Sequence, residues 1–167
     1  PGHHFQIALQ QEQPDTPLLM KVMGFSAYSE GWGLYAEQLA DEIGAYENDP
    51  FGQIGYLQSL MFRAARLVVD SGLHHKRWSL EQGIRYMVDT LGDQESSIAT
   101  EVERYCVWPG QASSYKVGHT TWVKLREDAK RRLGDRFDIK GFHDAGLNLG
   151  GVPLTVLERT MNAWTPT

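Results

Sequence analysis

The feature that most constrains the fold of this chain is its hydrophobic periodicity, which is helical along nearly all of its 167 residues. Residues 51–74 place apolar side chains at the i, i+3, i+4 and i+7 spacing that forms one face of a helix. These side chains are Ile54, Leu57, Met61, Ala64, Ala65 and Val68. No stretch shows the sustained apolar/polar alternation of a strand. The sequence therefore predicts an all-α fold, and it predicts that this stripe is buried.

Local stop and start signals divide the pattern into helices. Ser79 and Gln82 have the spacing of a capping box, Asp138 can cap a short helix, and glycines at 92 and 134 are expected to end two others. The expected helices cover residues 2–12, 27–46, 51–74, 79–91, 94–105, 111–133, 138–147 and 153–164. We find no repeat, linker or low-complexity segment, so we expect residues 1–167 to form a single all-α unit.

Composition excludes several classes of protein. The chain has 16 basic and 21 acidic residues and a net charge of −5, which disfavours nucleic acid as a partner. No apolar run reaches the roughly 18 residues of a membrane span. The single cysteine, Cys106, excludes an intrachain disulfide and a cysteine-rich zinc module, and we expect it to be buried. The compartment, cytoplasmic or exported, stays open.

Two adjacent histidines, His3 and His4, lie at the start of the first expected helix, and Glu30 lies in the next long one. Imidazole nitrogen and carboxylate oxygen are both common zinc ligands. Consecutive side chains on a helix point about 100° apart, so at most one of the two histidines is expected to bind a given ion. The sequence alone leaves open which one it is.

Glu30 can be interpreted in two ways. With Glu37 and Asp41 it forms an acidic helix face that could simply be solvated. However, it is flanked by Gly31 and Gly33, and a glycine inside a helix costs about 1 kcal/mol relative to alanine. We therefore predict that another element approaches closely here and that Glu30 is less exposed than its helix face implies.

A third group of candidates lies in the middle and at the end of the chain. Arg66, Asp70 and His74 recur at i, i+4 and i+8, so Asp70 could pair with Arg66 and accept a hydrogen bond from His74. This group could be a structural ion pair or could support a catalytic imidazole. Tyr115 and His143 could donate hydrogen bonds to a developing oxyanion, or could be ordinary core and helix-end residues.

Taken together, these segments resemble the bacterial domain-of-unknown-function family 885 (DUF885), a group similar to zinc-dependent peptidases whose third ligand is a glutamate. The resemblance covers nearly the whole chain, in the expected order. The segments that carry it are Pro1-Gly2-His3-His4-Phe5-Gln6, Glu30-Gly31-Trp32-Gly33-Leu34-Tyr35-Ala36-Glu37, residues 63–74, Arg104-Tyr105, Pro109-Gly110-Gln111-Ala112, Tyr115-Lys116, Phe142-His143-Asp144 and Pro153-Leu154.

The resemblance implies a multi-helix fragment of a catalytic domain, namely the C-terminal part of a larger metallopeptidase-like domain, with zinc as its cofactor. By position, Glu30 and either His3 or His4 are the implied metal ligands. The family pattern also has a His-Glu pair just upstream of the position of Pro1, which would supply a further ligand and the general base. The missing N-terminal part of the same protein is therefore an expected partner.

The leading hypothesis is a zinc-dependent hydrolase that cleaves peptide amide bonds with metal-activated water. Tyr115, His74 or His143 would stabilise the tetrahedral oxyanion. Arg66 and Asp70 would not contact the substrate but would position these side chains. Because a site with two ligands and no base cannot activate water efficiently, residues 1–167 alone are expected to be inactive. The expected substrate is a peptide.

The alternative hypothesis is a non-catalytic helical domain that binds peptides or acts as a scaffold. In that case an aromatic cleft lined by Trp32, Tyr35 and Tyr115 would bind a peptide without cutting it. A redox or storage site within a helical bundle ranks last, because the chain lacks the repeated Glu-x-x-His motifs that such a site needs.

Overall fold

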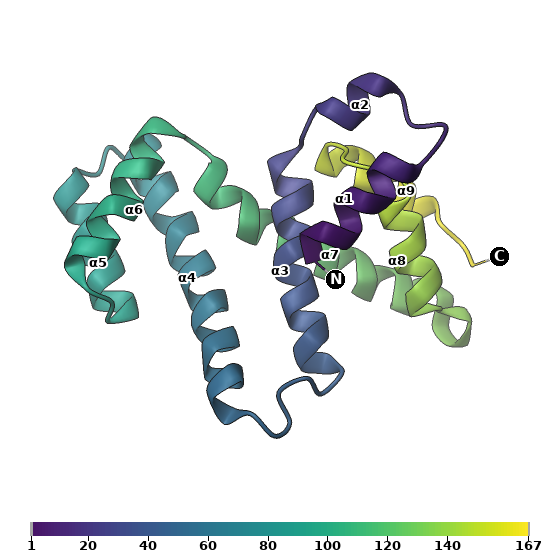
Figure 1. Ribbon diagram of the computed structural model, residues 1–167, viewed down its shortest axis with the longest axis horizontal. Helices are drawn as coiled ribbons and strands as arrows, with labels where there is room; N and C mark the ends of the chain where they lie inside the picture. The colour runs from purple at the N-terminus through teal and green to yellow at the C-terminus, as the bar shows by residue number, and fades with distance from the viewer. Residues whose placement is uncertain (1, 167) are drawn as a thin grey trace. The chain divides into compact units, whose positions relative to one another are not determined.

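The computed structural model describes residues 2–166 and confirms the all-α fold (Figure 1). No residue from 2 to 166 lies in a strand, and no helix in this range has the length and apolarity that a membrane crossing requires. The elements are α1 (Gly2–Glu12), α2 (Leu18–Val22), α3 (Ser26–Glu42), α4 (Pro50–His74), α5 (Leu80–Leu91), α6 (Glu95–Val107), α7 (Gln111–Leu133), the 3₁₀ turn η1 (Gly134–Arg136), α8 (Ile139–Leu147) and α9 (Leu154–Ala163).

Most helix boundaries follow the predicted local signals. Ser79 and Gln82 form the predicted capping box at the start of α5, each side chain bonding to the backbone N–H of the other residue. Gly92 follows the last residue of α5 with φ 73°, a left-handed conformation that favours glycine. The Asp138 carboxylate accepts two N–H groups in the first turn of α8. The short helix α2 was not predicted from the sequence.

The described chain divides into two compact units. Unit 1 comprises residues 1–36 and 118–167, and unit 2 comprises residues 37–117. The helices α3 and α7 each contribute residues to both units.

Unit 1 is built around aromatic side chains. Tyr28, Trp32 and Tyr35 of α3 are buried. Trp122 of α7 packs against all three, with ring centroids 5.3–6.0 Å away. Rings at such distances, in tilted, edge-to-face or stacked arrangements, add to the stabilisation that burial gives.

Two glycines allow α3 and α7 to pack backbone to backbone within unit 1. A Cβ atom on Gly118 would lie 2.7 Å from the Cα atom of Gly31, and a Cβ atom on Gly31 would lie 2.9 Å from the backbone nitrogen of His119. Any larger residue would force the helices apart. The predicted close approach at Gly31 is thus confirmed.

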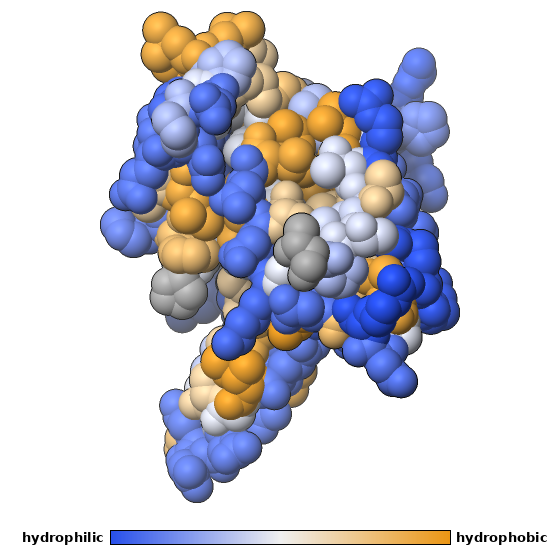
Figure 2. Space-filling view, turned by 90° about the vertical axis from the view of Figure 1, so that its right-hand side faces the viewer, coloured by the Kyte–Doolittle hydropathy of each residue, from blue (hydrophilic) through white to orange (hydrophobic). Residues whose placement is uncertain are grey.

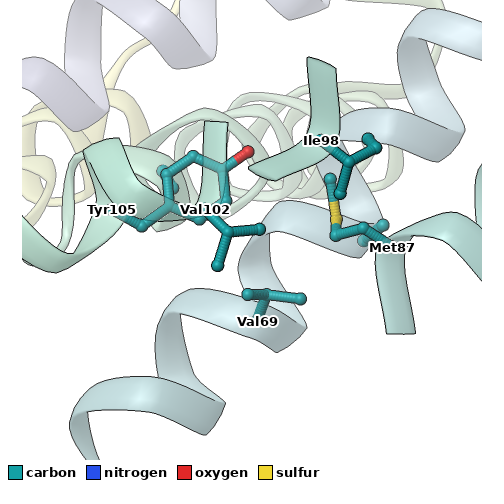
Figure 3. Close-up of a cluster of buried hydrophobic side chains, with 7 residues drawn as sticks. Val69, Met87, Ile98, Val102 and Tyr105 are labelled. Carbon is teal, nitrogen blue, oxygen red and sulfur yellow. The ribbon is translucent and has the colours of Figure 1, made fainter. Parts of the chain in front are cut away.

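Unit 2 has a mainly aliphatic core formed by α4, α5, α6 and the start of α7 (Figure 3). Its buried members are Ala65, Val69, Met87, Ile98, Val102, Tyr105 and Ala112. This core lies on the C-terminal half of α4, because Ala65 and Val69 are the buried α4 residues of the cluster.

Two burial predictions are wrong. The predicted stripe of α4 is exposed at Ile54, Leu57, Met61 and Val68. The core formed with α5 and α6 uses instead the face that carries Ala65 and Val69. Cys106 is also exposed, as are the residues that follow it at the end of α6.

Candidate functional site

The first candidate site, in unit 1, joins the start of α1 to α3. His3 Nε2 lies 3.1 Å from Glu30 Oε2. The Glu30 side chain is 19% exposed and that of His3 is 47% exposed, so the carboxylate is largely sheltered, as predicted. The neighbouring His4 is exposed, and on a helix its side chain points about 100° away from that of His3. The structure therefore pairs Glu30 with His3.

The position of His3 is set by contacts from α3. Trp32 Nε1 donates to the carbonyl oxygen of Gly2 at 3.1 Å, which attaches the start of α1 to α3. The imidazole of His3 occupies the space above Gly33, where a Cβ atom would lie 2.8 Å from Cε1 of the ring. The prediction of a close approach beside Glu30 is therefore confirmed at this glycine as well. Pro1, which begins the predicted motif, lies outside the described residues.

The chemistry of this pair suits zinc. Zinc–nitrogen and zinc–oxygen bonds of about 2.0–2.2 Å in a tetrahedral shell separate two ligand atoms by about 3.3 Å, close to the observed distance. The pair can thus supply two positions of a shell. Within residues 2–166 there is no group of three or more His, Cys, Asp or Glu residues that could hold a metal.

His143, also in unit 1, is anchored in the aromatic core. Its Nε2 atom lies 2.9 Å from the Tyr35 hydroxyl, which also accepts a hydrogen bond of 3.4 Å from Arg126. The Trp32 ring packs edge-on against the imidazole, with centroids 5.6 Å apart. Trp32 therefore contacts both His143 and the start of α1. Because Trp32 and Tyr35 are buried, the prediction that they line an open aromatic cleft is wrong.

The second group of candidates lies in unit 2, where Asp70 of α4 caps the start of α7. Its buried carboxylate accepts hydrogen bonds from the backbone N–H of Gly110 (3.1 Å), the N–H of Ser113 (3.0 Å) and the Ser113 hydroxyl (2.7 Å). A carboxylate at a helix N-terminus satisfies N–H groups that have no partner within the helix and interacts favourably with the helix dipole. Among the described residues, Asp70 and Arg66 form no ion pair, although their spacing allowed one.

His74 is held next to this cap. Its Nε2 atom lies 3.0 Å from the carbonyl oxygen of Tyr105 and 3.4 Å from Asp70 Oδ1. A carbonyl oxygen can only accept, so Nε2 carries the proton. The predicted hydrogen bond from His74 to Asp70 is therefore replaced by one to the Tyr105 carbonyl, and Asp70 remains a close neighbour of the imidazole.

Arg66 and Tyr115 are connected through Gln111. Arg66 donates to Gln111 Oε1 (3.2 Å), and Gln111 Nε2 donates to the Tyr115 hydroxyl (3.3 Å). The guanidinium of Arg66 also stacks over the Tyr115 ring, 4.5 Å from its centroid, and Arg63 stacks on the same ring at 4.8 Å. Because the Tyr115 hydroxyl accepts the bond from Gln111, its own hydrogen is available to donate.

Glu101 lies among cationic side chains in unit 2. Burial raises the pKa of Glu101, but the hydrogen bond from Arg104 (2.8 Å) and the charges of Arg104 and Arg66 outweigh it, so this pKa lies below its usual value. The Tyr105 hydroxyl also donates to Glu101 (3.2 Å). Burial of Tyr105 is the largest influence on its own pKa, which is raised.

The predicted site residues thus fall into two groups, with His3, His4, Glu30 and His143 in unit 1 and Arg66, Asp70, His74 and Tyr115 in unit 2. Sequence reasoning missed the side chains that hold these residues in place: Tyr35 and Arg126 behind His143, Ser113 beside Asp70, and Gln111 between Arg66 and Tyr115. The polar run after Pro109-Gly110 could have indicated two of them, since a helix start needs capping partners.

Comparison with known proteins gives one family and two informative structures. A family model described as a bacterial protein of unknown function (DUF885) matches residues 1–161. A protein of Colwellia psychrerythraea described as a lipoprotein is 55% identical, with a TM-score of 0.95, over 98% of this chain and 28% of that chain. A lipoprotein of unknown function from Shewanella oneidensis is 28% identical, with a TM-score of 0.88, over 96% of this chain and 29% of that chain. The chain therefore spans less than a third of either relative. No curated protein matches it.

Proposed function

The chain belongs to the bacterial DUF885 family, and we propose that it forms part of a zinc-dependent hydrolase that cleaves amide bonds in peptides. The observation that carries this proposal is the convergence of His3 Nε2 and Glu30 Oε2 at 3.1 Å. An imidazole and a largely sheltered carboxylate, brought together from two helices over a glycine, supply the donor types that catalytic zinc sites use.

In this proposal His3 and Glu30 would hold the ion, and Trp32 and Gly33 would fix the position of His3. Zinc held there would supply a water that ionises near neutral pH and would polarise a substrate carbonyl group. The remaining ligand and the general base would come from outside this chain, since the family resemblance places a His-Glu pair in the preceding part of the protein.

Within unit 1, His143 is the candidate hydrogen-bond donor to the tetrahedral oxyanion. Its imidazole has a fixed orientation against Tyr35 and Trp32, and a prepositioned donor lowers the cost of forming an oxyanion. Tyr115 and His74 belong to unit 2, and their proposed role as donors rests on the family resemblance. Arg66 would hold Gln111, which in turn positions the Tyr115 hydroxyl. Asp70 would act by fixing the start of α7.

The test is hydrolysis of a mixture of peptides by the full-length gene product, followed by mass spectrometry with and without a chelator. We expect chelator-sensitive cleavage that Glu30→Gln abolishes. The control is Glu42→Gln, which changes an exposed glutamate at the end of the same helix and should leave cleavage unchanged. Cleavage that survives both the chelator and Glu30→Gln would contradict the proposal.

The isolated chain gives a second test of the same proposal. Because residues 1–167 would supply only part of the zinc shell and no general base, we expect no hydrolysis of the same peptides by this chain alone. Robust, chelator-sensitive cleavage by the isolated chain would show that the base lies within it and would contradict the proposed division of the site.

A further inference from the structure

The first half of α4 presents an apolar surface to solvent. Phe51, Ile54, Leu57 and Met61 are all exposed, Phe51 and Leu57 to 84% and 55%. Together with Leu91 of α5 they form what we call the α4 apolar face, and Ile54, Leu57, Met61 and Leu91 border a shallow hollow of about 310 Å³. Figure 2 views the side that lies on the right in Figure 1, where apolar side chains also gather into patches between hydrophilic ones. Single exposed apolar residues are ordinary, but a contiguous row of them marks an interaction surface.

The sequence of this segment is typical of a buried helix. Residues 50–62 contain no Asp, Glu, Lys or Arg, so no charged side chain of this half of α4 is available to solvate any of its faces. A helix that lacks a charged face is normally covered by other elements. The predicted burial of the stripe therefore fails because the core of unit 2 does not include it, whereas the pattern itself is that of a covered helix.

Gly55 lies inside α4 but does not belong to this face. It borders a separate hollow that also contains charged side chains, formed with Gln58, Ser59, Phe62, Arg63 and Asp93. A Cβ atom on Gly55 would meet nothing within 4 Å, so Gly55→Ala should stabilise the isolated chain, because alanine is the better helix former.

From these observations we propose that the α4 apolar face is the docking surface for an apolar helical segment of the same polypeptide, from outside residues 1–167, which packs against Ile54, Leu57 and Met61. The length of the relatives supports this occupant. This chain matches the Colwellia protein over 98% of its own length but only 28% of that chain, so most of the longer protein lies outside the match. A covering segment from that part would remove the row of apolar side chains from water.

The first test is the effect of one substitution in two contexts. In the isolated 167-residue chain, Leu57→Gln should change the free energy of unfolding little, because Leu57 is 55% exposed. In the full-length gene product the same change should lower stability, because the glutamine would be buried against the docked segment. A small effect in both contexts would overturn the proposal, as would a full-length product no longer than this chain.

Thiol labelling provides a measurement that does not depend on stability. In a Cys106→Ser background, which removes the exposed native thiol, Leu57→Cys should react quickly with a maleimide in the isolated chain and at least about tenfold more slowly in the full-length product. Ser97→Cys, on an exposed part of α6, should label equally fast in both. Slow labelling of Leu57→Cys in the isolated chain would overturn the proposal, and if protection rose with concentration the occupant would be a second copy.

Discussion

Asp70 illustrates how a single buried carboxylate can fix the start of a distant helix. The side chain comes from α4, but the groups that it binds belong to the segment at Gly110 and Ser113 where α7 begins. The cap therefore ties two parts of unit 2 that are about forty residues apart in the chain. Removing its charge should loosen the start of α7 and the adjoining position of His74.

We predict that Asp70→Asn lowers the free energy of unfolding by about 2–3 kcal/mol, because a buried amide replaces a carboxylate that accepts three hydrogen bonds, and bonds to a charged group are the stronger ones. Urea denaturation measures this loss. Asp138→Asn is the matched control, since Asp138 caps α8 from an exposed position and asparagine is an equally good N-cap residue, so this change should cost less than about 1 kcal/mol. Equal losses in the two variants would mean that burial of Asp70 adds nothing to the cap.

Glu101 makes a prediction about pH. Its pKa is lowered in the folded protein, so the stability that it contributes is fully present above the pKa of about 4.5 in the unfolded chain and is lost as the pH falls through the folded value. Urea denaturation should therefore show Glu101→Gln to be less stable than the wild type at neutral pH, with a difference that shrinks on acidification. Glu103→Gln, an exposed change on the same helix, is the matched control for the loss of one negative charge. A pH-independent difference for Glu101→Gln would contradict the assignment.

Residue types could be predicted from the sequence better than residue partners. The two adjacent histidines indicated a candidate ligand, but the sequence left open which one it is. The position of α1 over Gly33 places His3, and not His4, beside Glu30. In the same way, Asp70, Arg66 and His74 were identified by spacing, yet Asp70 binds the start of α7 and Arg66 binds Gln111. Partners that come from another helix depend on tertiary packing, which periodicity along one helix does not contain.

At the scale of elements, the contact between α3 and α7 depends on glycine. Gly118→Ala in the isolated chain should lower the free energy of unfolding by about 2 kcal/mol or more, because the new methyl group would press on the carbonyl oxygen of Ala27 and the Cα atom of Gly31. Gly55→Ala in the same chain is the control and should be stabilising. A neutral Gly118→Ala would show that the two helices can move apart at little cost.

Gly33 should act as a positioning residue for the metal. A methyl group at this position would occupy the place of the His3 ring and move it away from Glu30, while the exposed imidazole has room to shift, so the fold should persist. We predict that Gly33→Ala weakens zinc binding by the full-length gene product by about tenfold with an unchanged helical circular dichroism spectrum. Zinc affinity is measured by competition with a chelating dye. An unchanged affinity would show that Gly33 does not position His3 for zinc binding.

Element boundaries were largely predictable because their signals are local. Ser79 with Gln82, Gly92, Gly134 and Asp138 act within a few residues of the helix ends that they define. Helix α2 was missed because its five residues are too few to show a period. The burial of the α4 stripe was mispredicted because burial depends on which elements are present to cover a face.

For the whole molecule, the chain is a helical region that matches less than a third of the length of its solved relatives. The zinc proposal concerns unit 1 and the docking proposal concerns unit 2, so each can fail without the other. Both, however, assign a role to polypeptide outside residues 1–167: it completes the metal shell in the first case and covers the α4 apolar face in the second.

The most direct test of the central claim is the zinc content of the full-length gene product, measured by mass spectrometry of the metal after dialysis against a weak chelator. We predict about one zinc ion per chain in the wild type, in Glu42→Gln and in His4→Ala. Glu30→Gln and His3→Ala should both lose the ion. Absence of zinc from the wild type, or equal zinc in the wild type and Glu30→Gln, would contradict the claim that His3 and Glu30 hold a catalytic metal.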